Sequence, residues 1–154
     1  MNRIPLLLTL SVAFLFAPLS STRAAKGDVI DVSKIRNSVY ISLGQKVTVA
    51  FDQRGDQLVN PRRVQSVQKG PVVTLEFSAD DKKKGLLMLW VKSSYARIVR
   101  YRAAFRLKGR RDFLETNMLP LNPNIPVLEG WMDPFDELVL FDFHLTNEKP
   151  PKSA

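Results

Sequence analysis

The chain contains no cysteine, and this absence has the widest consequences. Without a thiol it can form no disulfide, carry no lipid on a cysteine and use no cysteine nucleophile. It also has one histidine, His144, so a zinc site or a serine triad would have to be built on that residue. We therefore expect no metal, no cofactor and no triad chemistry, and we expect His144 to be solvent-facing or hydrogen-bonded.

Several short motifs are also missing. The sequence holds no Gly-x-Ser-x-Gly elbow, no Asp-x-Asp-x-Asp-Gly calcium loop and no Asn-x-Ser/Thr glycosylation acceptor. Small secreted eukaryotic domains often rely on disulfides, so the lack of both cysteine and a glycosylation acceptor favours a bacterial exported protein. With no catalytic motif, the sequence predicts a protein that is not an enzyme.

Long apolar runs are absent except at the amino terminus, where residues 4–19 form one. Arg3 precedes this run and small residues follow it as far as Ala24, which is the layout of a secretory signal. Thr22 and Ala24 fit the −3 and −1 positions of a cleavage site. The alternative, a membrane anchor, would need about 20 apolar residues to cross a bilayer core. We expect a signal peptide over residues 1–24 and a periplasmic or secreted protein.

Cleavage after Ala24 would leave 130 of the 154 residues, the size of one domain. We expect this domain to span residues 25–146, with a polar, proline-containing tail over residues 147–154. Its charge is uneven: 19 basic and 7 acidic residues lie between Ala25 and Arg111, whereas 2 basic and 8 acidic residues lie beyond. This asymmetry predicts either two oppositely charged surfaces or internal pairing between the halves.

Residues 86–107 organise the rest of the chain. In the second half of this stretch, apolar side chains alternate with polar or small ones; the apolar ones are Val99, Tyr101, Ala103, Phe105 and Leu107. A strand places alternate side chains on opposite faces, so this period of two predicts a strand with one apolar face. The preceding run, residues 86–91, is apolar throughout, which is typical of a strand buried on both sides. We expect these two strands to pair as a hairpin through a turn at residues 93–96.

Similar alternation recurs along the chain. Residues 39–43 and 47–51 alternate on either side of Gly44, where a turn or bulge would move the chain between sheets. Further strands are expected at residues 72–77, 113–119 and 138–145, and residues 127–131 are expected to form either a short strand or a loop whose tryptophan covers one end of the core. Residues 41–49 resemble the first strands of immunoglobulin-like sandwiches. The predicted fold is all-β, an antiparallel β-sandwich that is immunoglobulin-like in general architecture.

Two proline-containing segments interrupt this pattern. Residues 60–61, Asn-Pro, mark a break followed by a polar link. Pro120, Pro123 and Pro126 exclude a helix and a central strand, so they predict an extended surface segment.

Four cations occupy alternate positions of the second central strand: Arg100, Arg102, Arg106 and Lys108. Strand geometry places alternate side chains on one surface, about 6.6 Å apart. Guanidinium groups suit phosphate and carboxylate partners, and the absence of interleaved aromatic side chains argues against nucleic acid. The sequence therefore predicts an exported binding domain that contacts an unidentified protein or an anionic envelope component through this basic strand face. The alternative is that these cations pair with acidic neighbours or are only solvated.

Two other functions are open at this point. Four carboxylates lie near two aromatic side chains in the sequence: Glu129, Asp133, Asp136 and Glu137, with Trp131 and Phe135. Paired carboxylates beside aromatics are what an enzyme acting on envelope carbohydrate would use, although acidic turn residues that offset the basic half would give the same composition. The last possibility is a structural subunit whose edge strand completes the sheet of another chain.

Overall fold

The computed structural model describes residues 27–65 and 70–148, and these form an all-β fold with no α-helix in the described part. The elements are β1 (Val29–Ile30), the 3-10 helix η1 (Val32–Lys34), β2 (Val39–Ser42), β3 (Lys46–Arg54), β4 (Gln57–Val64), β5 (Val72–Ala79), β6 (Leu87–Ser93), β7 (Ile98–Leu107), β8 (Phe113–Thr116), β9 (Val127–Trp131) and β10 (Phe135–Thr146). All ten strands pair in one antiparallel sheet. The prediction of an all-β, antiparallel fold is confirmed.

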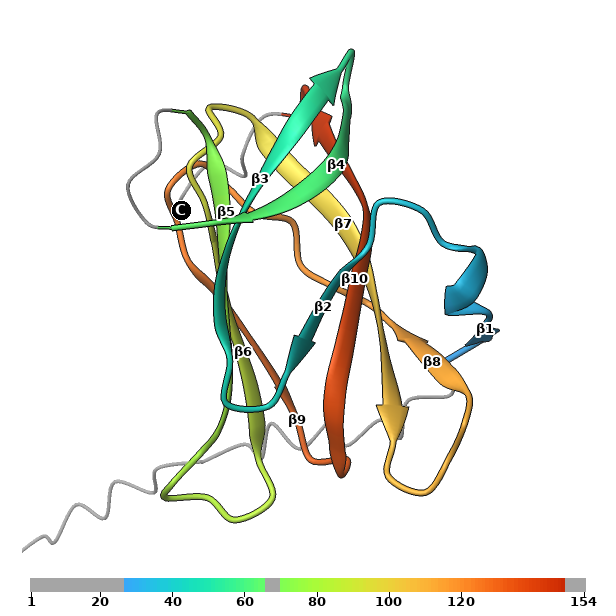
Figure 1. Cartoon of the computed structure of the whole chain (residues 1–154). Coiled ribbons are helices and arrows are strands. Elements are labelled where there is room, and N and C mark those ends of the chain that lie inside the picture. The colour runs from blue at the N-terminus through green and yellow to red at the C-terminus, as the bar shows by residue number, and fades with distance from the viewer. Residues whose placement is uncertain (1–26, 66–69, 149–154) are drawn as a thin grey trace, which may run out of the picture.

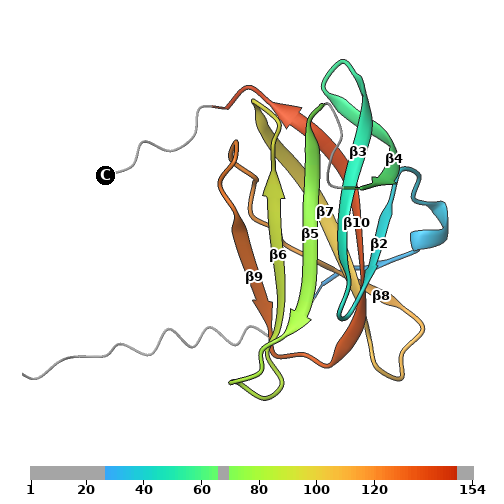
Figure 2. The same ribbon diagram turned by 60° about the vertical axis from the view of Figure 1, so that its left-hand side comes forward.

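The order of pairing divides this sheet into two sides. One side has the order β4-β3-β5-β6-β9, and the other has the order β1-β8-β7-β10, with β2 on the second edge of β10. The two sides are joined at the residue pair of Gln57 in β4 and His144 in β10. Figures 1 and 2 show the sheet curled so that β5 and β6 lie across from β7 and β10. We call these two parts the β6 side and the β7 side.

The core lies between the two sides. Phe77 of β5 stacks on Phe135 of β10 with ring centroids 5.4 Å apart, and Phe105 of β7 lies 4.6 Å from the same ring. Tyr101 of β7 stacks on Phe143 of β10 at 5.5 Å. Inward and outward residues alternate along these strands, so the period of two in the sequence separates core from surface.

The predicted strands at residues 86–107 exist, but the predicted hairpin between them is wrong. β6 pairs with β5 and β9, whereas β7 pairs with β8 and β10. The connection passes from the β6 side to the β7 side. Along it Tyr95 is buried, the Tyr95 amide donates to Ser93 Oγ, and the Ser94 amide donates to the Val72 carbonyl. A tight hairpin turn would leave the Tyr95 ring in water, so burial of this ring favours the crossing.

The prediction that the first of these strands is buried on both faces is also wrong. Its inward residues are buried, but the outward residues Met88, Trp90 and Lys92 are partly exposed. β6 is nevertheless an interior strand, because it has β5 on one edge and β9 on the other. The outward positions carry apolar residues, so the sequence showed a continuous apolar run where the structure has two distinct faces.

Both proline-containing segments belong to the sheet. The predicted break at residues 60–61 is wrong, because β4 continues through Asn60, which has a positive φ of 51° near a bulge in the pairing with β3. The segment with three prolines was predicted to be extended and on the surface, but it turns at Asn124, which has a φ of 60°, and it is not confined to the surface. Leu121 is fully buried and exchanges backbone hydrogen bonds with Val99, and Pro123 bridges to Ser93. This segment therefore lies between β7 and the end of β6.

Two local features set which residues face the core. Gly44 has a φ of 84°, a conformation that glycine adopts readily, and it lies in the turn between β2 and β3. β2 pairs with β10 on the β7 side, whereas β3 pairs with β4 and β5 on the β6 side, so the chain changes sides at this turn. This is the change that the glycine predicted. In β10 a bulge at Asp142, with a φ of 55°, breaks the alternation, so that Leu140 faces inward before it and Phe143 faces inward after it.

The predicted signal peptide, residues 1–24, lies outside the described residues. So does most of the predicted tail, but its first residues are described, and Glu148 binds Arg100. Over residues 27–65 and 70–148, no helix has the length and apolar character needed to span a membrane.

Candidate functional site

The predicted basic strand face lies on the outer surface of the β7 side. Its arginines point outward while the intervening residues point into the core, as the alternation predicted. Each arginine binds one carboxylate, in the pairs Arg100–Glu148, Arg102–Glu115 and Arg106–Glu137. Lys108 lies one residue beyond β7, is exposed and has no ion pair within the described part of the chain. These three pairs join the basic half of the sequence to the acidic half, which is the internal pairing that the charge distribution allowed.

A second, smaller hydrophobic cluster interrupts this face. It contains Ala104, Phe113, Val139 and Phe141, packed against Ile30, Val32 and Ile35. Residues 28–36, which we call the N-terminal segment, therefore cover the middle of the β7 side. The guanidinium carbons of Arg102 and Arg106 lie over the neighbouring rings of Phe141 and Phe113, at 5.1 and 5.4 Å from the centroids. Two of the predicted binding residues, Arg102 and Arg106, thus pack on aromatic rings of the second hydrophobic cluster.

The Arg102–Glu115 pair has the geometry of a strong contact. Arg102 Nε and Nη2 donate to Glu115 Oε1 and Oε2 at 2.7 and 2.6 Å. These two hydrogen bonds hold the pKa of the Glu115 carboxyl below its usual value and raise the pKa of Arg102. An external phosphate or carboxylate would have to compete with a carboxylate that is already in place.

The carboxylates proposed for an enzyme do not converge on one point. Glu129 accepts a hydrogen bond from the Leu119 amide at 2.7 Å, and burial raises the pKa of the Glu129 carboxyl. Glu137 lies on the outer face of the β7 side, with its Oε2 2.9 Å from Arg106 Nη2. Glu129 shares the face of β9 that packs on the core, so the two glutamates lie on different faces of the sheet. Asp136 is exposed and Asp133 is partly exposed.

No metal-binding cluster is found in residues 27–65 and 70–148, where no three His, Cys, Asp or Glu side chains are grouped to hold an ion. His144 Nδ1 lies 2.9 Å from the Asp142 carbonyl oxygen, which can only accept a hydrogen bond. The prediction of a hydrogen-bonded histidine is confirmed.

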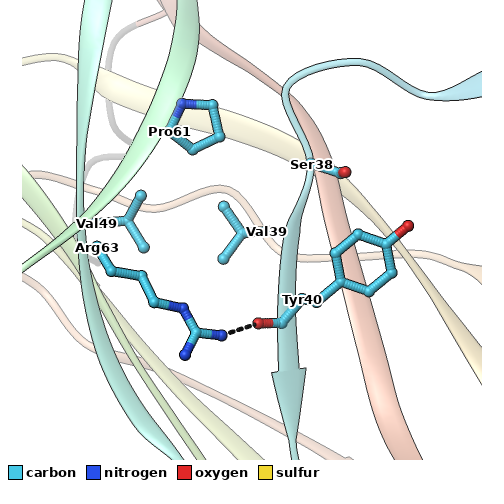
Figure 3. Close-up of a pocket in the computed structure, with 6 residues that line it drawn as sticks. All are labelled: Ser38, Val39, Tyr40, Val49, Pro61 and Arg63. Atoms are coloured by element: carbon cyan, nitrogen blue, oxygen red, sulfur yellow. Dashed lines mark hydrogen bonds between the residues drawn. The ribbon is translucent and has the colours of Figure 1, made fainter.

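A crevice of about 210 Å³ separates β2 from β3 and β4 (Figure 3). Arg63 Nη2 donates to the Tyr40 carbonyl at 2.8 Å across it. The figure shows the Tyr40 ring and the Ser38 hydroxyl pointing away from the crevice, toward the side opposite Arg63. The lining that remains is mostly apolar and includes Val39 and Val49, so this crevice presents one polar side chain that already has a partner.

A different surface remains on the outer face of the β6 side. The strand register places Lys46, Glu76, Trp90 and Leu128 in one row across β3, β5, β6 and β9. Residues directly opposite each other on paired strands point to the same face, and strands lie about 4.8 Å apart, so this row is about 14 Å long. Ser78 and Met88 lie beside it, and the six residues line an open groove of about 340 Å³. We call these six residues the Trp90 face.

The Trp90 face carries three apolar side chains, Met88, Trp90 and Leu128. Leu128 is 59% exposed, and Trp90 and Met88 are partly exposed. None of the three belongs to either hydrophobic cluster, whereas Trp131 packs edge-on against Phe135 in the core. The sequence did not reveal this surface, because an apolar run gives no sign of which side faces water. Only the strand pairing of Trp90 with Glu76 and Leu128 identifies this surface, and the sequence does not show which strands pair.

Comparison with protein-family models, with curated proteins and with solved structures finds no match to this chain.

Proposed function

We propose that the chain is an exported, non-enzymatic binding domain that contacts a component of the cell envelope through the Trp90 face. The observation that carries this proposal is a tryptophan, a methionine and a leucine side by side on an outer face that no hydrophobic cluster of residues 27–65 and 70–148 covers. A partner that covers the apolar area these side chains still expose would gain about 25 cal/mol for each Å² buried. Tryptophan and methionine are also enriched in binding surfaces.

The two outer faces of the molecule support this choice. On the β7 side, the N-terminal segment packs against the central apolar residues of the outer face. On the β6 side, Trp90 and Leu128 have no such cover within the described chain. The basic strand face is the less favoured contact, because Arg100, Arg102 and Arg106 are each bound to a carboxylate. An anionic envelope component would gain little from charges that are already neutralised.

The proposal that the domain is not an enzyme is supported by the positions of the acidic side chains. Glu129 and Glu137 are held by different partners on different faces of the sheet. The alternative role, a subunit that adds an edge strand to another chain, would use β9, the last strand of the β6 side. The Glu129 and Trp131 side chains of β9 contact Leu119 and Thr116 on the core-facing side of the strand, so they would take no part in such pairing.

We further propose that the curled sheet is a β-sandwich, immunoglobulin-like in general architecture. Support comes from the aromatic residues of both sides that meet in one core, and from the connection between β6 and β7, which passes from one side to the other. In such a sandwich two sheets pack face to face over a shared core, which leaves the outer side of each sheet available for contact with a partner.

The test is retention of the purified protein on isolated, insoluble envelope material. We expect co-sedimentation of the wild-type protein, and at least a tenfold weaker retention of Trp90→Ala and Leu128→Ala. Leu119→Ala is the matched control, since Leu119 is 56% exposed but lies off this face. Retention of Trp90→Ala at the wild-type level would overturn the assignment of the Trp90 face, provided that thermal unfolding shows the variant folded.

A further inference from the structure

The Trp90 face combines an apolar ring with hydrogen-bonding groups of both kinds. Lys46 Nζ lies 2.9 Å from Glu76 Oε2, and these side chains are 64% and 46% exposed, so both remain accessible to a ligand. Ser78 lines the same groove, and the Thr48 and Thr74 hydroxyls lie 3.4 Å apart in the next row of the face. Lysine donates, glutamate accepts and the hydroxyls do both.

We propose, building on the binding function above, that the ligand of the Trp90 face is an uncharged glycan chain. A sugar ring has an apolar C–H face that can stack on the indole of Trp90, and a rim of hydroxyl groups that both donate and accept. The Lys46–Glu76 pair is next to Trp90 in the row and can meet that rim with a donor and an acceptor at once. An aromatic platform with a few polar groups at its border is the usual make-up of a small-ligand site.

Other partners fit this surface less well. The centre of a protein interface is depleted in lysine and glutamate, yet Glu76 lies directly opposite Trp90 in the strand register. An anionic polymer or lipid surface would meet Glu76 at that same position. The Trp90 face carries one positive and one negative charge, on Lys46 and Glu76, which favours a ligand without net charge. Lys92 lies outside this face, opposite Thr74 in the next row.

The shape of the face is compatible with a chain of several sugars. The row of about 14 Å is longer than one sugar ring, and the groove along it is open rather than enclosed. Gly130 lies opposite Met88 in the neighbouring row and leaves that position without a side chain. Its φ is not positive and an added Cβ would meet no atom closer than 3.5 Å, so the backbone does not require glycine there. The bare position extends the flat area beside Trp90.

The experiment is isothermal titration calorimetry of the wild-type protein with two neutral probes, chitohexaose and cellohexaose. We expect saturable binding of at least one hexasaccharide, little changed between 50 mM and 500 mM salt. Trp90→Ala should weaken it at least tenfold, Trp90→Phe should restore part of it, and Glu76→Gln should weaken it several-fold. Leu119→Ala, the exposed control off the face, should bind as the wild type does.

Three results would overturn the glycan proposal: no binding of either hexasaccharide, binding that survives in Trp90→Ala, or salt-sensitive binding confined to hyaluronan, the anionic control polymer. The envelope co-sedimentation test separates this failure from failure of the binding function. If Trp90→Ala abolishes retention on the envelope but neither hexasaccharide binds, the face is kept and its ligand is not a neutral glycan. If Trp90 matters in neither experiment, both proposals fail. Gly130→Val, which fills the bare position, provides a second variant with the Trp90 ring intact.

Discussion

At the scale of single residues, the direction of a side chain followed from the sequence but its partner did not. The period of two placed Arg100, Arg102 and Arg106 on one outward face, and the structure confirms that face. Their carboxylate partners come from 13 to 48 positions away in the chain, and no local pattern links such distant positions. The candidate site therefore moved from charges that were visible in the sequence to a tryptophan whose exposure was not.

Arg102→Gln should destabilise the protein more than Arg100→Gln does. Arg102 makes two hydrogen bonds to Glu115 and lies over Phe141, which together are worth about 1 kcal/mol of unfolding free energy. Arg100 has only the exposed Glu148 as its partner, so its replacement should cost under about 0.5 kcal/mol. Urea unfolding of the two variants measures the difference. Equal losses would show that Arg102 is not a structural residue.

The cost of Arg102→Gln should also depend on pH. The folded protein holds the pKa of Glu115 below its ordinary value of 4.5, so the stabilisation is present above that value and is lost as the pH falls through the lowered pKa. The difference in unfolding free energy between wild type and variant should therefore be full at pH 7 and smaller at pH 3. A difference that does not change with pH would mean that the Glu115 carboxylate plays no part.

At the scale of elements, most strands could be located in the sequence, but their neighbours could not. Alternation marked β2, β3, β5, β7 and β10, and Gly44 marked the change from one side of the sheet to the other. The connection at residues 93–96 resembled a hairpin turn because its residues are small and polar apart from Tyr95. Burial of Tyr95 and the pairing of Leu121 with Val99 are contacts between distant segments, so they could not be anticipated.

The N-terminal segment gives a prediction at this scale. Ile35 is partly buried against the cluster that contains Phe113 and Phe141, so Ile35→Ala should lower the unfolding free energy by about 1–2 kcal/mol. Leu119→Ala removes a comparable side chain from an exposed position and should change it by less than about 0.5 kcal/mol. Urea midpoints compare the two. Equal stability of these variants would mean that the segment does not cover the β7 side in solution.

At the scale of the whole molecule, its two outer faces explain how a basic sequence can present a nearly neutral outer face such as the Trp90 face. The β7 side uses its cations internally, against carboxylates from the acidic half and against two aromatic rings. The Trp90 face on the β6 side holds the ion pair Lys46–Glu76 beside its exposed apolar residues. The row of cations on one strand pointed to a protein or an anionic envelope component as the partner, because a sequence shows charges without showing which of them are already paired.

Export is the last prediction, and it concerns the whole chain. If residues 1–24 are a signal peptide, the exported protein should begin at Ala25, and intact-mass measurement should give that start. The described fold begins two residues later, at Gly27. An added Cβ at Gly27 would lie 2.0 Å from the Glu115 carbonyl oxygen, so the chain is already packed against β8 there. The carbonyl of the next residue, Asp28, accepts a hydrogen bond from the Glu115 amide. Cleavage after Ala24 would thus spare every strand, and the exported form should keep the unfolding free energy and the Trp90-dependent binding of the full chain. Ala24→Leu should slow processing, because a small residue is needed at the cleavage site. Recovery of a wild-type protein that retains Met1 would overturn the cleavage prediction in favour of a membrane anchor and leave the fold unaffected.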